Sequence, residues 1–372
     1  MISELHIAFL MVICFLVSIF IFNLNFFNFL DEYHKNNNKE IEGWRYILSF
    51  CVVFCHYVFS YYFVNDNMWI APGYNFTCNL GAFGVSQFFM ITAYLFWGRD
   101  FSDSKEYIKM IVKRYFRIFP ISFISSFLCI IISIVYIIND KGFSHINVNL
   151  PNILWWFDAG AINYRPDFSE FARSRFVNAG VTWTLHWEWI FYFLLPLIYF
   201  FRNMFSILII ICIYTFLSFE NICQSIGLCF LGGALTLYVP KYKFSKIWVI
   251  LLIYLCFSVG EQAISLEAIP FGCALFYMIA NHENIFGLLN IKSITRMGRI
   301  SYSIYLIHGV LWFIMFEILK SLKMSFFVFD LFTIITFIMI LLCSAFLYHK
   351  VEKPFMIIGK KLASKIDYSW LR

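Results

Sequence analysis

Apolar residues form long runs along most of the chain, and the short stretches between them are polar and rich in lysine and arginine. A run of about 20 apolar residues is long enough to cross a hydrocarbon core as an α-helix. The pattern predicts membrane helices near residues 5–30, 45–64, 80–97, 118–138, 183–201, 205–219, 222–239, 247–260, 264–281, 300–319 and 326–348. We therefore expect an all-α, polytopic integral membrane protein with about 11 transmembrane helices.

The composition supports this interpretation. Of the 372 residues, 61% are hydrophobic and 13% are charged, which excludes a soluble protein because so much apolar surface could not be buried. The first apolar run follows Glu4 and lacks a small-residue cleavage site, so it predicts a retained helix rather than a signal peptide. The 11 cysteines show no paired spacing. They predict packing residues, with no metal site and no disulfide framework.

The basic residues predict the orientation. Alternate loops, together with Arg45, hold 22 of the 28 lysines and arginines, and the remaining loops hold only Lys141, Arg165, Arg173, Arg175, Lys320 and Lys323. Because cytoplasmic loops carry the excess of basic residues, the N-terminus is predicted outside and the C-terminus in the cytoplasm. The net charge of +6 then reflects topology and not a nucleic-acid partner.

The helix predicted at 45–64 carries two ionisable residues. Arg45 and His56 are 11 residues apart, which is almost three helical turns, so they share one face and stand roughly 16 Å apart along the axis. If Arg45 marks the membrane surface, His56 lies near mid-membrane, where an ionisable side chain indicates function. The alternative is a structural hydrogen bond to a neighbouring helix.

A second basic site precedes the helix predicted at 118–138. Arg114 and Arg117 are three residues apart and face the same way on a helix. Two guanidinium groups at the inner membrane surface could hold phosphates bidentately. The alternative is an anchor that contacts lipid headgroups.

Further polar residues lie in later predicted helices. Glu188 is about one and a half turns into its helix and needs a partner, which could be a histidine that it orients. His308 lies roughly 12–15 Å from the inner surface, so His56, Glu188 and His308 are expected to converge. Ser301 and Tyr302 are further candidates, although helix packing would also explain them. The Val351–Phe355 stretch is interpreted as a charged helix end that proline terminates.

One large outer loop is predicted between residues 139 and 182. Its aromatic and acidic side chains suit a sugar, which offers C–H faces and hydroxyl groups; they are Trp155, Trp156, Asp158, Tyr164, Asp167 and Glu170. The alternative is an aromatic belt at the membrane interface beside a solvated loop.

Six motifs follow one another in a specific order. They are Arg-x10-His (45–56), Gly-Val-x-x-Phe-Phe (84–89), Arg-x-x-Arg-Ile-x-Pro (114–120), Trp-x-Leu-x-x-Glu (183–188), Ser-Tyr-Ser-Ile-Tyr-Leu-Ile-His (301–308) and Val-Glu-Lys-Pro-Phe (351–355). In this combination the chain resembles the membrane-bound acyltransferase-3 family over residues 40–356. Residues 1–39 then hold an additional N-terminal helix and a basic linker before a ten-helix core, and residues 357–372 form a cytoplasmic tail.

The resemblance implies an O-acetyltransferase of the bacterial inner membrane. It would move an acetyl group from cytoplasmic acetyl-CoA to a hydroxyl of a surface polysaccharide or its lipid-linked precursor, such as O-antigen, capsule or exopolysaccharide. By position, Arg45 and His56 match the family's essential pair, and Arg114 and Arg117 match the basic pair that meets the donor's phosphates. Glu188 matches the acidic position, and we expect it to fix the tautomer of His56.

Two departures and three alternatives accompany this hypothesis. The family pattern Gly-Val-Asp is Gly84-Val85-Ser86 here, and Thr92-Ala93 replaces Ser-Gly, so no carboxylate role is expected at Ser86. His308, on the Tyr-Leu-Ile-His motif, is a further candidate. The alternatives are a transporter or flippase for polysaccharide or lipid-linked sugar, transfer of succinyl in place of acetyl, and a scaffold in a polysaccharide export complex.

Overall fold

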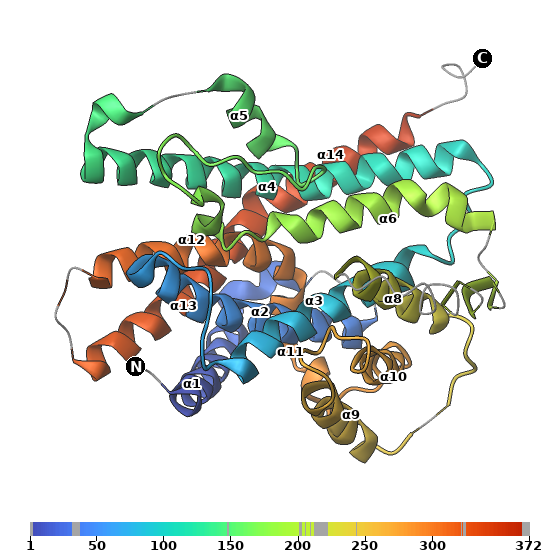
Figure 1. The fold of residues 1–372 in the computed structure, drawn as a ribbon. Helices are drawn as coiled ribbons and strands as arrows, with labels where there is room; N and C mark the ends of the chain where they lie inside the picture. The colour runs from blue at the N-terminus through green and yellow to red at the C-terminus, as the bar shows by residue number, and fades with distance from the viewer. Residues whose placement is uncertain are drawn as a thin grey trace.

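The computed structural model describes residues 3–31, 38–146, 149–200, 203–204, 206–208, 210–211, 222–242, 244–320, 322 and 325–366. This part of the chain contains helices and no β-strand, apart from an isolated bridge between Phe168 and Phe171. The helices are α1 (Glu4–Asn23), α2 (Lys39–Asp66), α3 (Asn75–Phe96), α4 (Ser104–Lys141), α5 (Leu150–Leu154), α6 (Thr182–Phe200), α8 (Ile222–Leu235), α9 (Ile247–Ser258), α10 (Ile269–Ala280), α11 (Lys292–Arg299), α12 (Ser301–Lys320), α13 (Phe326–Leu347) and α14 (Lys353–Ser364) (Figure 1).

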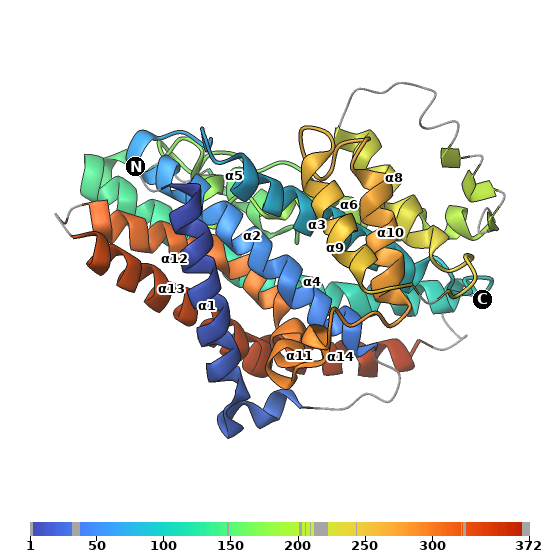
Figure 2. The same cartoon turned by 90° about the horizontal axis from the view of Figure 1, so that it is seen from below.

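Six helices of the described chain are long and apolar enough to cross a membrane, and they confirm a polytopic membrane protein. They are α1, α2, α3, α4, α12 and the continuous segment Phe326–Ser364 that contains α13 and α14. The shorter apolar helices α8, α9 and α10 form a separate group beside them (Figure 2). The exact number of 11 spans stays a prediction, and most of the helix predicted at 205–219 lies outside the described residues.

Two predictions of helix ends are wrong: the start of α4 and the termination at Pro354. Helix α4 begins at Ser104 rather than at 118 and has 38 residues. At 1.5 Å per residue it is about 57 Å long, which exceeds the hydrocarbon thickness, so its basic first part extends beyond the core. Pro354 does not end a helix. The chain passes from α13 through a π-helical turn, Tyr348–Glu352, into α14. Pro354 lies in the first turn of α14, where a backbone N–H would have no partner within the helix, so the N–H that proline lacks is not missed.

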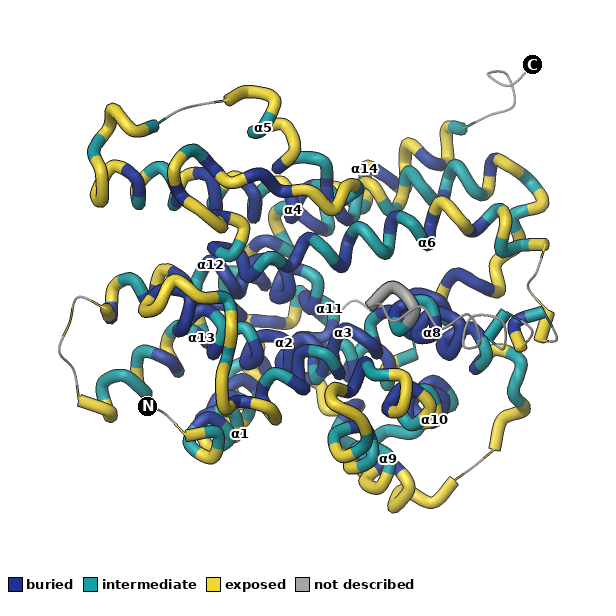
Figure 3. The backbone as a smooth tube through the Cα atoms, in the orientation of Figure 1, coloured by how far each residue is buried: buried dark blue, intermediate teal, exposed yellow. Residues whose placement is uncertain are grey.

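The most buried helices are α2, α3 and α12 at the centre of the molecule, where α2 packs against both α3 and α12 (Figure 3). We call the end of this bundle that holds Arg45 the basic end. The opposite end, which holds the loop from Gly142 to Val181, is called the loop end. Helix α2 starts at the basic end because Asn38 caps it, its side chain accepting a hydrogen bond from the Ile41 N–H at 3.2 Å.

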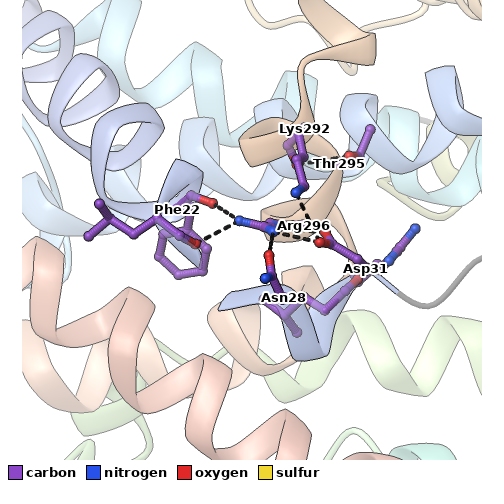
Figure 4. A network of polar contacts seen from close by, with 9 residues as sticks. Phe22, Asn28, Asp31, Lys292, Thr295 and Arg296 are labelled. Atoms are coloured by element: carbon purple, nitrogen blue, oxygen red, sulfur yellow. Dashed lines mark hydrogen bonds and ion pairs between the residues drawn. The ribbon is translucent and has the colours of Figure 1, made fainter. Parts of the chain in front are cut away.

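The N-terminal helix is fastened to the basic end by one arginine of α11 (Figure 4). Arg296 is 1% exposed, and its guanidinium donates to both carboxylate oxygens of Asp31 at 2.6 Å. It also donates to the Asn28 side chain at 2.5 Å and to the carbonyl oxygens of Phe22 and Leu24 at 2.7 and 2.9 Å. The side-chain hydrogen bond from Arg296 is a main reason why the pKa of Asp31 is lowered. The five hydrogen bonds use all five N–H donors of the Arg296 guanidinium.

Candidate functional site

Two histidines from separate helices meet inside the bundle. His56 on α2 and His308 on α12 lie with Nδ1 and Nε2 2.8 Å apart. Their ring planes agree within 7° while their centroids are 5.1 Å apart, so the rings lie edge to edge in nearly one plane. The predicted convergence of His56 with His308 is confirmed. His308 is fully buried, whereas His56 is only half-buried.

The hydrogen bonds of this pair define which nitrogen carries a proton when both rings are neutral. His308 donates from Nδ1 to the Ile304 carbonyl oxygen at 3.0 Å, because a carbonyl can only accept. Its Nε2 is therefore the acceptor, and His56 must donate from Nδ1. This assignment leaves Nε2 of His56 with a free lone pair, and none of the described residues hydrogen-bonds to that nitrogen.

Close packing fixes His308 in this position. A Cβ on the next residue, Gly309, would lie 2.4 Å from the backbone carbon of Asn178, so only glycine allows this approach. The Asn178 side chain donates to Ser125 on α4 at 3.2 Å, and Ser125 donates to the Leu306 carbonyl at 2.6 Å. The segment Ser174–Asn178, α4 and α12 are thereby tied together beside the histidine pair.

Aromatic residues surround His56 on the side toward the loop end. The ring of Trp69 lies 5.9 Å from the His56 ring, and that of Phe59 lies 6.4 Å from it. Trp69 in turn stacks on Phe176 with centroids 4.4 Å apart and planes within 3°. The sequence analysis did not single out Trp69 or Phe176, because residues in loops give no periodic signal that points to a buried site.

The basic end contains a cluster of opposite charges. Arg45 on α2 and Arg114 and Arg117 on α4 interact electrostatically with Glu188 on α6. Arg117 also lies 3.8 Å from Glu352. With all five groups charged, three positive charges face two negative charges, which leaves one positive charge for an anionic ligand.

Glu352 is the site residue that the sequence analysis interpreted wrongly. It is fully buried in the π-helical turn, and one carboxylate oxygen accepts from the Ser303 hydroxyl at 2.8 Å. The other oxygen has no hydrogen-bond partner among the described residues and is the one nearest Arg117. A carboxylate so buried needs a cation, and the basic motif around Arg117 was the signal that could have identified the pair.

The expected contact between Glu188 and His56 is wrong. Glu188 accepts hydrogen bonds from Thr92 and Tyr192 at 3.4 and 3.3 Å. The residue that hydrogen-bonds to His56 is His308 of α12, not Glu188. The carboxylate therefore belongs to the arginine cluster, where it opposes the positive charges, and not to the histidine pair.

A cavity of about 70 Å³ connects this charge cluster to the centre of the bundle. Its polar lining comes from Arg45, Glu188, Ser301, Tyr302, Tyr305 and Thr184, and its apolar lining from Val85, Phe88, Phe89 and Leu185. The volume is enough for several water molecules, since one needs roughly 10–15 Å³. Arg45, Glu188, Ser301 and Tyr302 were predicted site residues, and the structure brings them together around this space.

Tyr305 stands between this cavity and the histidine pair. It lines the cavity, and its ring centroid lies 6.1 Å from that of His308, one turn further along α12. Because Thr184 donates to the Val181 carbonyl at 3.0 Å, its oxygen is left to accept from the Tyr305 hydroxyl at 2.8 Å. The two halves of the site are thus neighbours, separated by one hydrogen-bonded tyrosine.

The loop residues that suggested a sugar site fall into two groups, and the prediction of a sugar site itself stays a prediction. Asp158 is structural, since it pairs with Arg165 and accepts from the backbone N–H groups of Gly160 and Ile162 at 2.8 and 2.7 Å. Trp155 and Tyr164 are exposed. Trp156, Asp167 and Glu170 instead line a separate pocket at the loop end.

Comparison with known proteins gives one match. A family model described as an acyltransferase domain, Acyl_transf_3, covers residues 38–349 of the chain. Neither the curated proteins nor the solved structures gave a match. The matched region begins at the cap of α2 and contains the histidine pair together with Arg45, Arg114, Arg117 and Glu188.

Proposed function

Because the chain belongs to the acyltransferase-3 family and is a polytopic membrane protein, we propose that it transfers an acetyl group from cytoplasmic acetyl-CoA to a glycan hydroxyl. Membrane acyltransferase activity follows from the family. The acceptor in this proposal is a cell-surface polysaccharide or its lipid-linked precursor, such as O-antigen, capsule or exopolysaccharide. The protein then resides in a bacterial inner membrane, with the basic end and the C-terminus in the cytoplasm and the N-terminus outside.

The arginines at the basic end form the donor site of this proposal. Acetyl-CoA carries phosphates that cannot enter hydrocarbon, so they must be held at the membrane surface. Arg114 and Arg117 point from one face of α4, and Arg45 lines the adjacent cavity. Guanidinium groups bind phosphate bidentately, and the excess positive charge of the cluster favours an anionic ligand.

His56 is the general base in the proposed reaction. Its Nε2 takes the proton of the acceptor hydroxyl while the hydroxyl oxygen attacks the thioester carbonyl. The tetrahedral intermediate then collapses, the C–S bond breaks, and the sulfur leaves with the proton from the imidazolium. The products are the O-acetyl ester and free CoA. His308 is a positioning residue, because its Nε2 accepts from His56 and holds the reactive tautomer.

For the reaction, the thioester has to pass from the cavity to His56. Tyr305 is the side chain in between, so the proposal requires this ring to turn aside when the donor binds. The Tyr305 hydroxyl hydrogen-bonds to Thr184 at 2.8 Å and lies 3.5 Å from the Val181 carbonyl oxygen, and each neutral hydrogen bond is worth roughly 0.5–1.5 kcal/mol. Donor binding can exceed that cost.

The observation that carries the proposal is the in-line pair of His56 and His308, which leaves an unprotonated nitrogen on the helix that also holds Arg45. The test uses membranes that contain the purified protein, trideuterated acetyl-CoA and glycan from cells that lack the protein. We expect His56→Gln to lower acetyl transfer by about 10²- to 10⁴-fold. Normal transfer by this variant at equal protein level would refute the proposal.

A matched control is His282→Gln, because His282 lies at the surface of the basic end, where it hydrogen-bonds to Glu40 at 3.2 Å. This variant should retain activity. Succinyl-CoA in a parallel reaction determines the acyl group, since the product mass distinguishes the two donors. Movement of glycan across the membrane without acetyl transfer would instead support a transporter.

A further inference from the structure

A second polar pocket lies at the loop end, away from the charge cluster. Its volume is about 250 Å³, and its polar lining comes from Asn149, Asn152, Trp156, Asp167, Ser169 and Glu170. None of these residues takes part in the proposed transfer. The pocket opens at the end of the molecule that the proposed function places outside the cell.

The walls of this pocket are held in place by the surrounding loop. Trp156 is 2% exposed and donates from its indole N–H to the Pro166 carbonyl at 3.2 Å. Glu170 pairs with Lys141 at 3.0 Å and with His145 at 3.1 Å. These two side-chain hydrogen bonds lower the pKa of Glu170, which therefore stays ionised and neutralised by its partners. The pocket is thus formed before any ligand binds.

Several polar groups in the pocket have hydrogen-bonding capacity left. The side-chain oxygen of Asn149 accepts a hydrogen bond from the backbone N–H of Asn152. One carboxylate oxygen of Asp167 accepts from the backbone N–H of Arg173 at 2.7 Å. Within the described chain, the side-chain NH₂ group of Asn149 and the whole side-chain amide of Asn152 make no hydrogen bond. The second oxygen of Asp167 is likewise without a partner there.

This combination of groups suits a neutral ligand that both donates and accepts hydrogen bonds. Amides supply donors and acceptors, and Asp167 supplies an acceptor. An anion would meet the carboxylates of Asp167 and Glu170. Lys141 already pairs with Glu170, so a cation would find Asp167 as its single open carboxylate. Sugar hydroxyl groups, which donate and accept hydrogen bonds and carry no charge, match these features best.

We propose that this pocket is a glycan subsite, which holds a sugar of the polymeric acceptor at a distance from the acetylated one. The inference rests on the proposed function and adds where a longer acceptor is held. The chain from Asp167 to Phe176 links the two sites. It starts at the pocket, its Phe171 packs against Phe63 on α2, and it ends at Phe176, which stacks on the tryptophan beside His56.

The test compares short and long acceptors. Oligosaccharides of one and of several repeat units are released from the surface polysaccharide of a strain that lacks this protein. Acetyl transfer from trideuterated acetyl-CoA to each is measured with wild type, Asn152→Ala, Asp167→Asn and the double variant. The control is Asn163→Ala, which removes an exposed asparagine of the same loop that does not line the pocket.

We expect the KM for the multi-unit acceptor to rise roughly two- to tenfold for each hydrogen bond removed, with kcat unchanged. The KM for the one-unit acceptor and the activity of the control should stay at the wild-type value. An unchanged KM for the multi-unit acceptor in the double variant would overturn the subsite. Equal binding of that glycan by wild type and double variant in saturation-transfer NMR would do the same. A wild type that acetylates neither acceptor would refute the proposed function instead.

Discussion

Replacing His308 tests whether the tautomer of His56 matters for transfer. In His308→Leu, the Nδ1–H of His56 loses the acceptor that lies 2.8 Å away in the wild type, the one acceptor it has among the described residues. Leaving a buried donor unpaired costs about 1–3 kcal/mol, and each 1.36 kcal/mol is tenfold in rate. We therefore expect kcat to fall by roughly 5- to 150-fold, less than for His56→Gln. Since Gln can offer a carbonyl oxygen to the same N–H, His308→Gln should lose less activity than His308→Leu.

The assay is acetyl transfer at saturating acetyl-CoA, with protein level and melting temperature measured for every variant. His308 is fully buried, so a leucine that lowers the melting temperature would be compared with His308→Asn, a smaller polar replacement. Wild-type kcat in His308→Leu would refute the argument from the hydrogen-bond direction. A greater loss in His308→Leu than in His56→Gln, at equal stability, would show that the roles of the two histidines are reversed.

Three further predictions concern the surroundings of the site. Gly309→Ala places a methyl group against backbone atoms, so it should cost about 1–3 kcal/mol of stability and lower acetyl transfer, which thermal unfolding and the transfer assay measure. Arg117→Gln removes the cation nearest the buried Glu352 and leaves Arg45 as its positive partner. It should cost about 2–3 kcal/mol of stability, at or below the low end for a broken buried pair, because Arg117 is partly exposed. The double variant with Glu352→Gln should regain most of that stability, and additive losses in the double-mutant cycle would contradict the pairing. Arg296 lowers the pKa of Asp31, so the Asp31 carboxylate stabilises the fold at a pH above its ordinary pKa and loses that contribution as the pH falls. The difference in melting temperature between wild type and Asp31→Asn should therefore shrink from pH 7 to pH 3. A constant difference would contradict this prediction.

Much of the site followed from helical periodicity and membrane depth. The spacing of Arg45 and His56 placed them on one face, and counting turns from the opposite surface placed His308 at a matching depth. Depth along a helix is readable from sequence because the rise per residue is constant. Depth alone placed Glu188 near His56 as well, and that expectation failed because Glu188 lies with the arginines of the basic end, where Thr92 of α3 donates to it at 3.4 Å.

The features that could not be predicted arise from irregular backbone and from loops. No periodic pattern indicates that Trp69 and Phe176, which are far apart in the sequence, stack on each other beside His56. The length of α4 was underestimated because its basic residues were assigned to a loop, although lysine and arginine are good helix formers. Glu352 was missed because a proline two residues later suggested termination.

The π-helical turn at Tyr348–Glu352 has a consequence for how this protein can vary. Such a turn holds one residue more than the regular helix, and deleting one of its residues would restore α-helical register. Because the wide turn absorbs this extra residue, the helix that follows would keep its orientation, whereas a residue deleted between the turn and Gly359 would swing Gly359 by about 100° around the axis. Gly359, which now sits flush against Phe116, would face elsewhere, and a bulkier side chain would meet the aromatic ring. The number of residues between the π-helical turn and Gly359 is therefore constrained, and a single-residue deletion in that stretch should separate Gly359 from Phe116.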